Sequence, residues 1–181
     1  MRGWARWGAL FGLGAVLGTA FDYIHVYYNV LTYAHADFHG TSLRFVPLEF
    51  GLSAVAGSVA ARGLARRCPP PAVGAGRFAL DFALLAVAYL ATGWLNGNHA
   101  LTALALVPLA VVSLATRRTG FTLAAAAAAG ALGPLSEMVV HAAGIFSYTF
   151  ADPVPYWLPL LWVVAAGLFV DVPLVLGVVG R

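Results

Sequence analysis

Ionisable side chains inside apolar segments are the residues of this chain that could do chemistry. Asp22 and His25 lie three positions apart, and Glu137 and His141 lie four positions apart. Both spacings place two side chains on one face of a helix. Glu49 adds a third carboxylate within another apolar stretch. Such groups are costly at membrane depth and usually face the interior of a helix bundle or an aqueous cavity, so they predict a buried polar site.

Four kinds of site could use these residues. A metal site could combine carboxylates and histidines, but the Glu-x-x-His pairs of ferritin-like bundles come from two helices, and only Asp22 and His25 have that spacing here. We therefore expect no metal. A membrane enzyme of lipid or carotenoid metabolism could use Glu137 or Asp22 as acid or base. The same groups could bind a lipid with a hydroxyl headgroup, or could bond to one another with no ligand.

The composition indicates the class of protein that must position these groups. The chain has 181 residues, of which 61% are hydrophobic and 9% charged, with a mean hydropathy of +0.86. So few charged side chains cannot cover a soluble domain, whereas a lipid-facing surface needs none. Runs such as "TLAAAAAAGAL" at 122–132 do not alternate and exclude an outer-membrane barrel. We expect one all-α integral membrane domain spanning residues 1–181.

Six apolar segments predict a bundle of six transmembrane helices. Most are near the ~20 residues that cross ~30 Å of hydrocarbon. They lie at about 7–27, 43–61, 78–95, 99–116, 120–141 and 156–179.

The arginines predict the orientation of this bundle. All ten basic residues are arginines, and nine of them fall on one side of the six segments, Arg44 being the exception. By the positive-inside rule both termini and the loops at 62–77 and 117–119 are cytoplasmic. Topology alone accounts for the basic pI, so we expect no nucleic-acid partner.

This topology brings most of the polar candidates into one layer near the outer side of the membrane, because five residues of helix rise only ~7.5 Å. We expect this layer to bind the ligand, with Asp81 merely near a cytoplasmic end and Asp171 deeper in the last helix. The predicted ligand-binding residues are Asp22, His25, Glu49, Asn98, His99, Glu137 and His141.

Small residues at four-residue spacing predict close helix packing. The first helix carries the pairs Gly8–Gly12 and Gly14–Gly18, and the fifth carries Ala126–Gly130 and Ala129–Gly133. These faces favour a homo-oligomer without giving its number. Pro108, Pro134 and Pro173 fall inside predicted spans and can kink them, which leaves room for a cavity.

The connector "GIFSYTFADPVPYWLP" at 144–159 is the most distinctive stretch. We expect Tyr148, Tyr156 and Trp157 to be anchors at the headgroup level. Asp152 precedes the last helix and could cap it or contribute to a partner surface.

This connector and the helix that follows, "GIFSYTFADPVPYWLPLLWVVAAGLF", resemble the segment joining the last two helices of the INSIG family of the endoplasmic reticulum. In the same order, "WGALFGLGAVLG" and "YYNVLTY" resemble that family's first helix and following loop. "NHALTALAL" resembles the start of its fourth helix, and "RRTGFTLAAAAAAG" the loop opening its fifth. The most specific elements are Tyr-Thr-x-x-Asp and Trp-Leu-Pro.

The resemblance implies six membrane helices, cytoplasmic termini and a non-enzymatic lipid sensor. Eukaryotic members bind oxysterols and retain SCAP and the reductase of sterol synthesis, and Asp152 matches a family aspartate important for the SCAP interaction. Glu137, His141 and Asp171 stand where less acidic residues are expected, and the sequence lacks the family's polar N-terminal extension and charged C-terminal tail. The composition, rich in alanine and arginine, suggests a bacterial inner-membrane protein, for which SCAP and cholesterol are not expected.

Together these observations predict a cavity for a neutral lipid, such as a diacylglycerol, a sterol-like lipid or an isoprenoid alcohol. A hydroxyl can donate to Glu49, Glu137 or Asp22, whereas a phosphate among three carboxylates is repelled. We expect no cofactor beyond this lipid, and a membrane-protein partner at Asp152. The alternatives are the enzyme described above and a purely structural oligomer.

Overall fold

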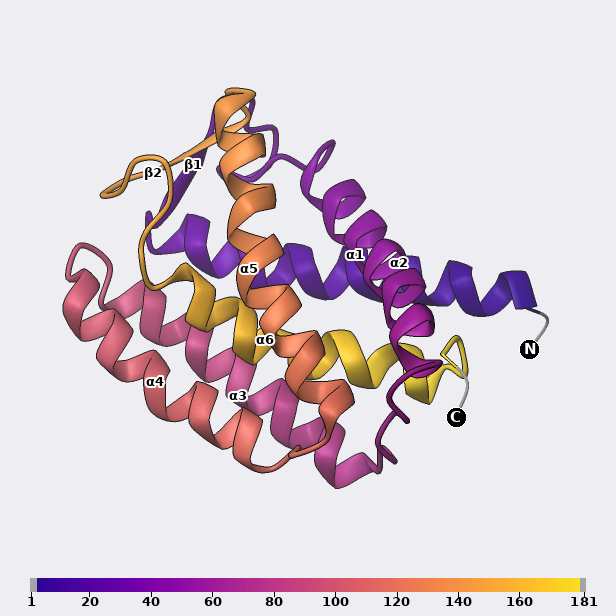
Figure 1. The fold of residues 1–181 in the computed structure, drawn as a ribbon. Coiled ribbons are helices and arrows are strands. Elements are labelled where there is room, and N and C mark those ends of the chain that lie inside the picture. The colour runs from indigo at the N-terminus through magenta and orange to yellow at the C-terminus, as the bar shows by residue number, and fades with distance from the viewer. Residues whose placement is uncertain (1–2, 180–181) are drawn as a thin grey trace.

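The computed structural model describes residues 3–179, which form six helices and two short strands (Figure 1). Arg2 and Arg181 of the topology argument lie outside this range. Each predicted segment overlaps one helix, although α1 and α3 start earlier than predicted, α2 ends later, and the last helix ends before the predicted 179. The elements are α1 Gly3–Tyr27, β1 Leu31–Tyr33, α2 Val46–Ala65, α3 Ala75–Trp94, α4 His99–Ala115, α5 Gly120–Ala142, β2 Phe146–Tyr148 and α6 Leu158–Val175.

Four helices, α1, α3, α5 and α6, are long and apolar enough to cross a membrane, and α4 is a shorter apolar helix. Large apolar side chains such as Val16, Leu104 and Val139 are exposed on these helices, as expected for a surface that faces lipid. The protein is therefore an integral membrane protein. Six spans and cytoplasmic termini remain predictions.

The centre of the bundle is α6, which contacts α2, α3, α4 and α5. In the apolar 18-residue stretch of α6, 56% of the residues are buried inside the protein, compared with 17–28% in the corresponding stretches of α1, α3 and α5. A helix that is apolar all round and surrounded by other helices has no polar face to expose. The main core accordingly includes Leu158, Leu161, Val164 and Leu168 of this helix.

Small residues allow close packing at three of the four predicted pairs, including Ala126–Gly130, where a Cβ on Gly130 would lie 3.0 Å from Val163 Cγ2. A Cβ on Gly14 would lie 2.7 Å from the Ala54 Cβ of α2, and one on Gly133 would overlap the Trp162 ring of α6. Gly8 and Gly12 differ, because a Cβ there would have no described atom within 4 Å. Within the described chain, this first pair faces outward and packs no helix.

The two strands form an antiparallel ribbon that joins the end of α1 to the α5–α6 connection. Leu31 pairs with Tyr148, and Tyr33 with Phe146. Side chains alternate across a strand, so these four residues turn inward and are buried, while Thr32 and Ser147 are exposed. The sequence did not predict this ribbon.

The ribbon corrects the expectation that the connector aromatics are interfacial anchors. Tyr148 is buried by the strand alternation, and Trp157 is only 2% exposed within the core. Of the three, Tyr156 remains an exposed aromatic.

At the opposite end of α1, arginines connect the start of α1 and the end of α2 to the end of α6. Arg6 Nη1 donates to the Gly177 carbonyl (3.0 Å), and Arg62 Nε donates to the Val178 carbonyl (2.7 Å). Cationic side chains at a helix C-terminus satisfy free carbonyls and complement the helix dipole. These three helix ends therefore lie on the same side, as alternating spans require.

Candidate functional site

Three of the predicted carboxylates meet in one chamber within the bundle. Asp22 from α1, Glu49 from α2 and Glu137 from α5 line it together with His25. The inward residues of both strands close one side, and α3 and α6 contribute Tyr89 and Trp162. Asp22, His25, Glu49 and Glu137 therefore lie together, as the prediction of a common polar layer required.

Glu137 is held in place by two donors. Trp162 Nε1 donates to Glu137 Oε1 (2.7 Å), and the Tyr148 hydroxyl donates to Oε2. Gly133, one turn earlier on α5, leaves the space that the Trp162 ring occupies. The carboxylate of Glu137 therefore presents a fixed acceptor to the chamber.

Asp22 and Glu49 keep free acceptor atoms. The Tyr33 hydroxyl donates to Asp22 Oδ1 (3.0 Å), whereas Asp22 Oδ2 is buried with no partner among the described residues. Glu49 also lines the chamber, and neither of its oxygens is hydrogen-bonded to another described residue. Buried polar atoms normally find partners, so Asp22 Oδ2 marks a position for a ligand or ordered water, and half-buried Glu49 lines the same space.

The tautomer of His25 follows from its neighbour. His25 Nε2 lies 2.8 Å from Thr92 Oγ1, and the Thr92 hydroxyl donates its single proton to the Tyr89 carbonyl (2.8 Å). His25 Nε2 must therefore carry a proton and donate to Thr92. In the neutral ring this leaves Nδ1 as an acceptor.

The two strand tyrosines remain donors over a wide pH range. Burial raises the pKa of Tyr33, and the neighbouring carboxylates, Asp22 foremost, raise it further. Burial likewise raises the pKa of Tyr148, and Glu137 adds to the effect. Both phenols therefore stay protonated and continue to donate to the carboxylates.

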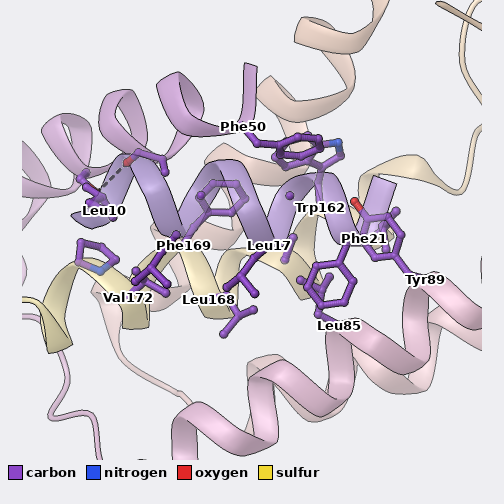
Figure 2. A pocket seen from close by; sticks show the side chains of 18 residues that line it. Leu10, Leu17, Phe21, Phe50, Leu85, Tyr89, Trp162, Leu168, Phe169 and Val172 are labelled. Carbon is purple, nitrogen blue, oxygen red and sulfur yellow. Dashed lines mark hydrogen bonds between the residues drawn. The ribbon is translucent and has the colours of Figure 1, made fainter. Parts of the chain in front are cut away.

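An apolar cavity adjoins the polar chamber (Figure 2). It has about 730 Å³ of empty space, counting its opening to the outside. Phe50, Tyr89, Leu161 and Trp162 line both spaces, so these four side chains form the boundary between the two. Its other walls come from α1, α2, α3 and α6 and include Leu10, Leu17, Leu85, Leu168 and Val172.

Asn98 and His99 lie outside the chamber and have other partners. Asn98 is the N-cap of α4 and accepts from the Leu101 amide (3.1 Å). His99 Nε2 lies 2.8 Å from the Phe150 carbonyl, and Trp157 Nε1 donates to His99 Nδ1 (3.1 Å). These contacts hold the α5–α6 connection against the start of α4.

His141 and Asp152 pair with each other at the outer surface. His141 Nε2 lies 3.2 Å from Asp152 Oδ1, and the Asp152 side chain is 90% exposed. Asp152 does not cap α6, which has Trp157 at its N-cap and no side-chain cap bond. The expected cap is wrong because the helix starts six residues after Asp152 and has a proline, without an amide donor, in its first turn.

A second buried polar cluster lies away from the chamber. Asp81 is 1% exposed, and it accepts from Arg77 Nε (3.0 Å) and Nη2 (2.9 Å). Arg117 pairs with the same carboxylate and with Asp171, where Nη2 and Oδ2 are 2.6 Å apart. Asp81 is therefore the centre of an ion-pair network rather than merely a residue near a helix end.

Sequence reasoning missed the aromatic donors of the chamber, namely Tyr33, Tyr89, Tyr148 and Trp162. Tyrosine and tryptophan in an apolar chain are common both in cores and at interfaces, so their types carried no signal. The alternation "LTY" and "FSY" could have indicated inward tyrosines, but three residues are too few to establish a period.

Comparison with known proteins gives a likeness of fold. No protein-family model matches the sequence, and no curated protein matches it. The Insig homologue MvINS from Mycobacterium vanbaalenii is similar with a TM-score of 0.76 and 22% identity, over 98% of this chain and 96% of that chain. A cross-linked, cysteine-substituted MvINS trimer has a TM-score of 0.77 and 21% identity over the same shares. The INSIG-like resemblance is therefore confirmed at the level of the fold.

Proposed function

We propose that this INSIG-like membrane protein binds a neutral, hydroxyl-bearing lipid inside its helix bundle and acts as a lipid sensor or regulator. The observation that carries the proposal is that the acidic chamber lies directly beside the apolar cavity, with only Phe50, Tyr89, Leu161 and Trp162 between them. A headgroup in the chamber would place its chain in the cavity. Diacylglycerols, sterol-like lipids and isoprenoid alcohols have this division between a hydroxyl end and an apolar body.

The charges of the chamber argue against an anionic lipid. Asp22, Glu49 and Glu137 line it, and no arginine of residues 3–179 does. A phosphate would meet acceptors and negative charge without a compensating cation. A hydroxyl, by contrast, can donate to Asp22 Oδ2 or Glu49, whose oxygens lack described partners.

The same geometry favours binding over catalysis. Both oxygens of Glu137 accept from donors on separate elements, Trp162 and Tyr148. This arrangement suits a fixed acceptor better than a group that must take up and release a proton. Incubation with candidate lipids separates the two functions, because an enzyme forms product and loses it with Glu137→Gln, whereas a binding protein returns the lipid unchanged.

We further propose that the protein is a homo-oligomer of the bacterial inner membrane. The similar MvINS structure is a trimer, and Gly8 and Gly12 leave an open face on α1. The exposed Asp152 carboxylate is the proposed contact for a membrane-protein partner. Native mass spectrometry would give the copy number, and a monomer at all detergent concentrations would contradict the assembly.

Native mass spectrometry also tests the ligand. Protein purified in mild detergent should retain a stoichiometric neutral lipid, which extraction and fragmentation would identify. Glu49→Gln/Glu137→Gln should lose it, because the headgroup acceptors are weakened, while the surface control Asp152→Asn should keep it. Retention of phospholipid alone, at equal levels in all three proteins, would overturn the proposed function.

A further inference from the structure

We propose that the lipid carries a primary amine beside its hydroxyl, so that the chamber selects a single-chain amino alcohol. This inference rests on the proposed hydroxyl-lipid site and specifies its ligand class, with a basic amine added to the otherwise neutral headgroup. Its basis is a shortage of hydrogen-bond donors and positive charge in the chamber, together with the shape of the adjoining cavity.

All but one of the protein's own donors in the chamber are already used. The Tyr33 hydroxyl donates to Asp22, the Tyr148 hydroxyl and Trp162 Nε1 donate to Glu137, and His25 Nε2 donates to Thr92. Of the donors that line the chamber, only the Tyr89 hydroxyl makes no hydrogen bond to another residue of 3–179.

Acceptors, in contrast, remain free. One is Asp22 Oδ2, which is buried without a described partner, in a residue that is 5% exposed. The others are the two oxygens of Glu49, which line the chamber and make no hydrogen bond to another described residue. The ligand must therefore supply several donors. A hydroxyl supplies one and a primary ammonium three, whereas the ester groups of a diacylglycerol supply acceptors only.

The charge balance favours an amine in the same place. Arg77, Arg117 and Arg44 do not neutralise the chamber carboxylates. Arg77 and Arg117 pair with Asp81 and Asp171, and the Arg44 side chain is 91% exposed. An ammonium against Asp22 and Glu49 forms a buried, hydrogen-bonded ion pair. When a protonated carboxyl receives a neutral amine, the proton passes from oxygen to nitrogen and the total charge is unchanged.

The apolar cavity accommodates one chain. It follows α1 from Phe21 to Leu10, about 16 Å of helix rise. It ends beside Val172 and Pro173 of α6. A single extended alkyl chain suits this path. We assign the amine to Asp22 and Glu49, and the hydroxyl to Glu137, whose orientation is already fixed by two donors.

The test compares sphinganine with two lipids of matched chain length. One is monostearoylglycerol, which has no nitrogen, and the other is N-acetylsphinganine, whose acetylated nitrogen is no longer basic. Binding is measured by native mass spectrometry and by competition in detergent. Sphinganine should bind at least tenfold more tightly than either. Asp22→Asn/Glu49→Gln should abolish that preference. Glu137→Gln should weaken the binding of all three lipids by the same factor, and Asp152→Asn should leave all three affinities unchanged.

The outcomes separate this inference from the proposed function. If monostearoylglycerol binds as tightly as sphinganine or more tightly, the proposed selection of an amine is overturned, while the proposed site for a hydroxyl-bearing lipid stands. Binding of none of the probes to wild-type protein, with no lipid retained from the membrane, overturns both. The N-acetylated lipid tests the amine with unaltered protein, so the result does not depend on whether the variants fold.

Discussion

Arg117, in the connection between α4 and α5, forms an ion pair with Asp171 near the end of α6, with 2.6 Å between Nη2 and Oδ2. The same guanidinium pairs with Asp81 of α3, which Arg77 also contacts. Two arginines and two aspartates therefore join three parts of the chain without net charge. Buried ions stay stable only when such partners are present.

Removing Arg117 should destabilise the protein strongly. Arg117→Met leaves Asp171 buried without its cation, and loss of one partner of a buried pair costs about 3–5 kcal/mol. Thermal unfolding in detergent, followed by tryptophan fluorescence, would measure the effect. Arg118→Met is the matched control, because Arg118 is the exposed next residue. Adding Asp171→Leu to Arg117→Met should restore much of the loss, and equal stability of the two single variants would contradict the network.

Gly133→Ala should destabilise the chamber wall. A Cβ at this position overlaps the ring of Trp162, the residue that donates to Glu137. Overpacking of this kind costs about 1–3 kcal/mol, and the shifted ring should change the tryptophan emission spectrum. Gly63→Ala on α2 is the control, since its Cβ meets no described atom within 4 Å. The close packing of α5 on α6 would be in doubt if both variants unfolded at the wild-type temperature.

Stability should fall at alkaline pH because of the two strand tyrosines. Burial raises the pKa of Tyr33 and of Tyr148, so above the ordinary tyrosine pKa of about 10 the folded state binds more protons than the unfolded state. The contribution of these two tyrosines to the free energy of unfolding is therefore fully present below about pH 10 and is lost as the pH rises further. Thermal midpoints between pH 8 and 11 should decline less in Tyr33→Phe/Tyr148→Phe than in wild type. Tyr156→Phe, which removes an exposed phenol, should keep the wild-type decline.

Asp152→Asn should leave stability almost unchanged. Its carboxylate is 90% exposed and contacts only His141 among the described residues, and exposed pairs of this kind contribute little. Asp152 is thus available as a surface carboxylate, as the proposed partner contact requires. Circular dichroism and the thermal midpoint of the variant would check this. A large loss of stability would instead make Asp152 a structural residue of the connector.

The helices could be predicted from the sequence because their apolar runs are as long as a membrane is thick, and Asp22, Glu49 and Glu137 stood out within those runs. Contacts between distant residues could not be predicted. Asp81 looked like a residue near a helix end, since Arg117 and Asp171 lie 36 and 90 positions away in the sequence. The inward turn of Tyr148 depended on a three-residue strand whose partner is more than a hundred residues earlier.

The β1–β2 ribbon has a consequence for how an occupant would exchange. Its inward residues Leu31, Tyr33, Phe146 and Tyr148 close the polar chamber at that end, whereas the apolar cavity reaches the outer face of α1 at Leu13, which is 41% exposed. A lipid leaving by this side passes directly into the bilayer without crossing water. Occupancy would then follow the mole fraction of that lipid among its neighbours in the membrane. Fusion with vesicles that lack the lipid would lower occupancy, while diluting intact vesicles with buffer would leave it unchanged.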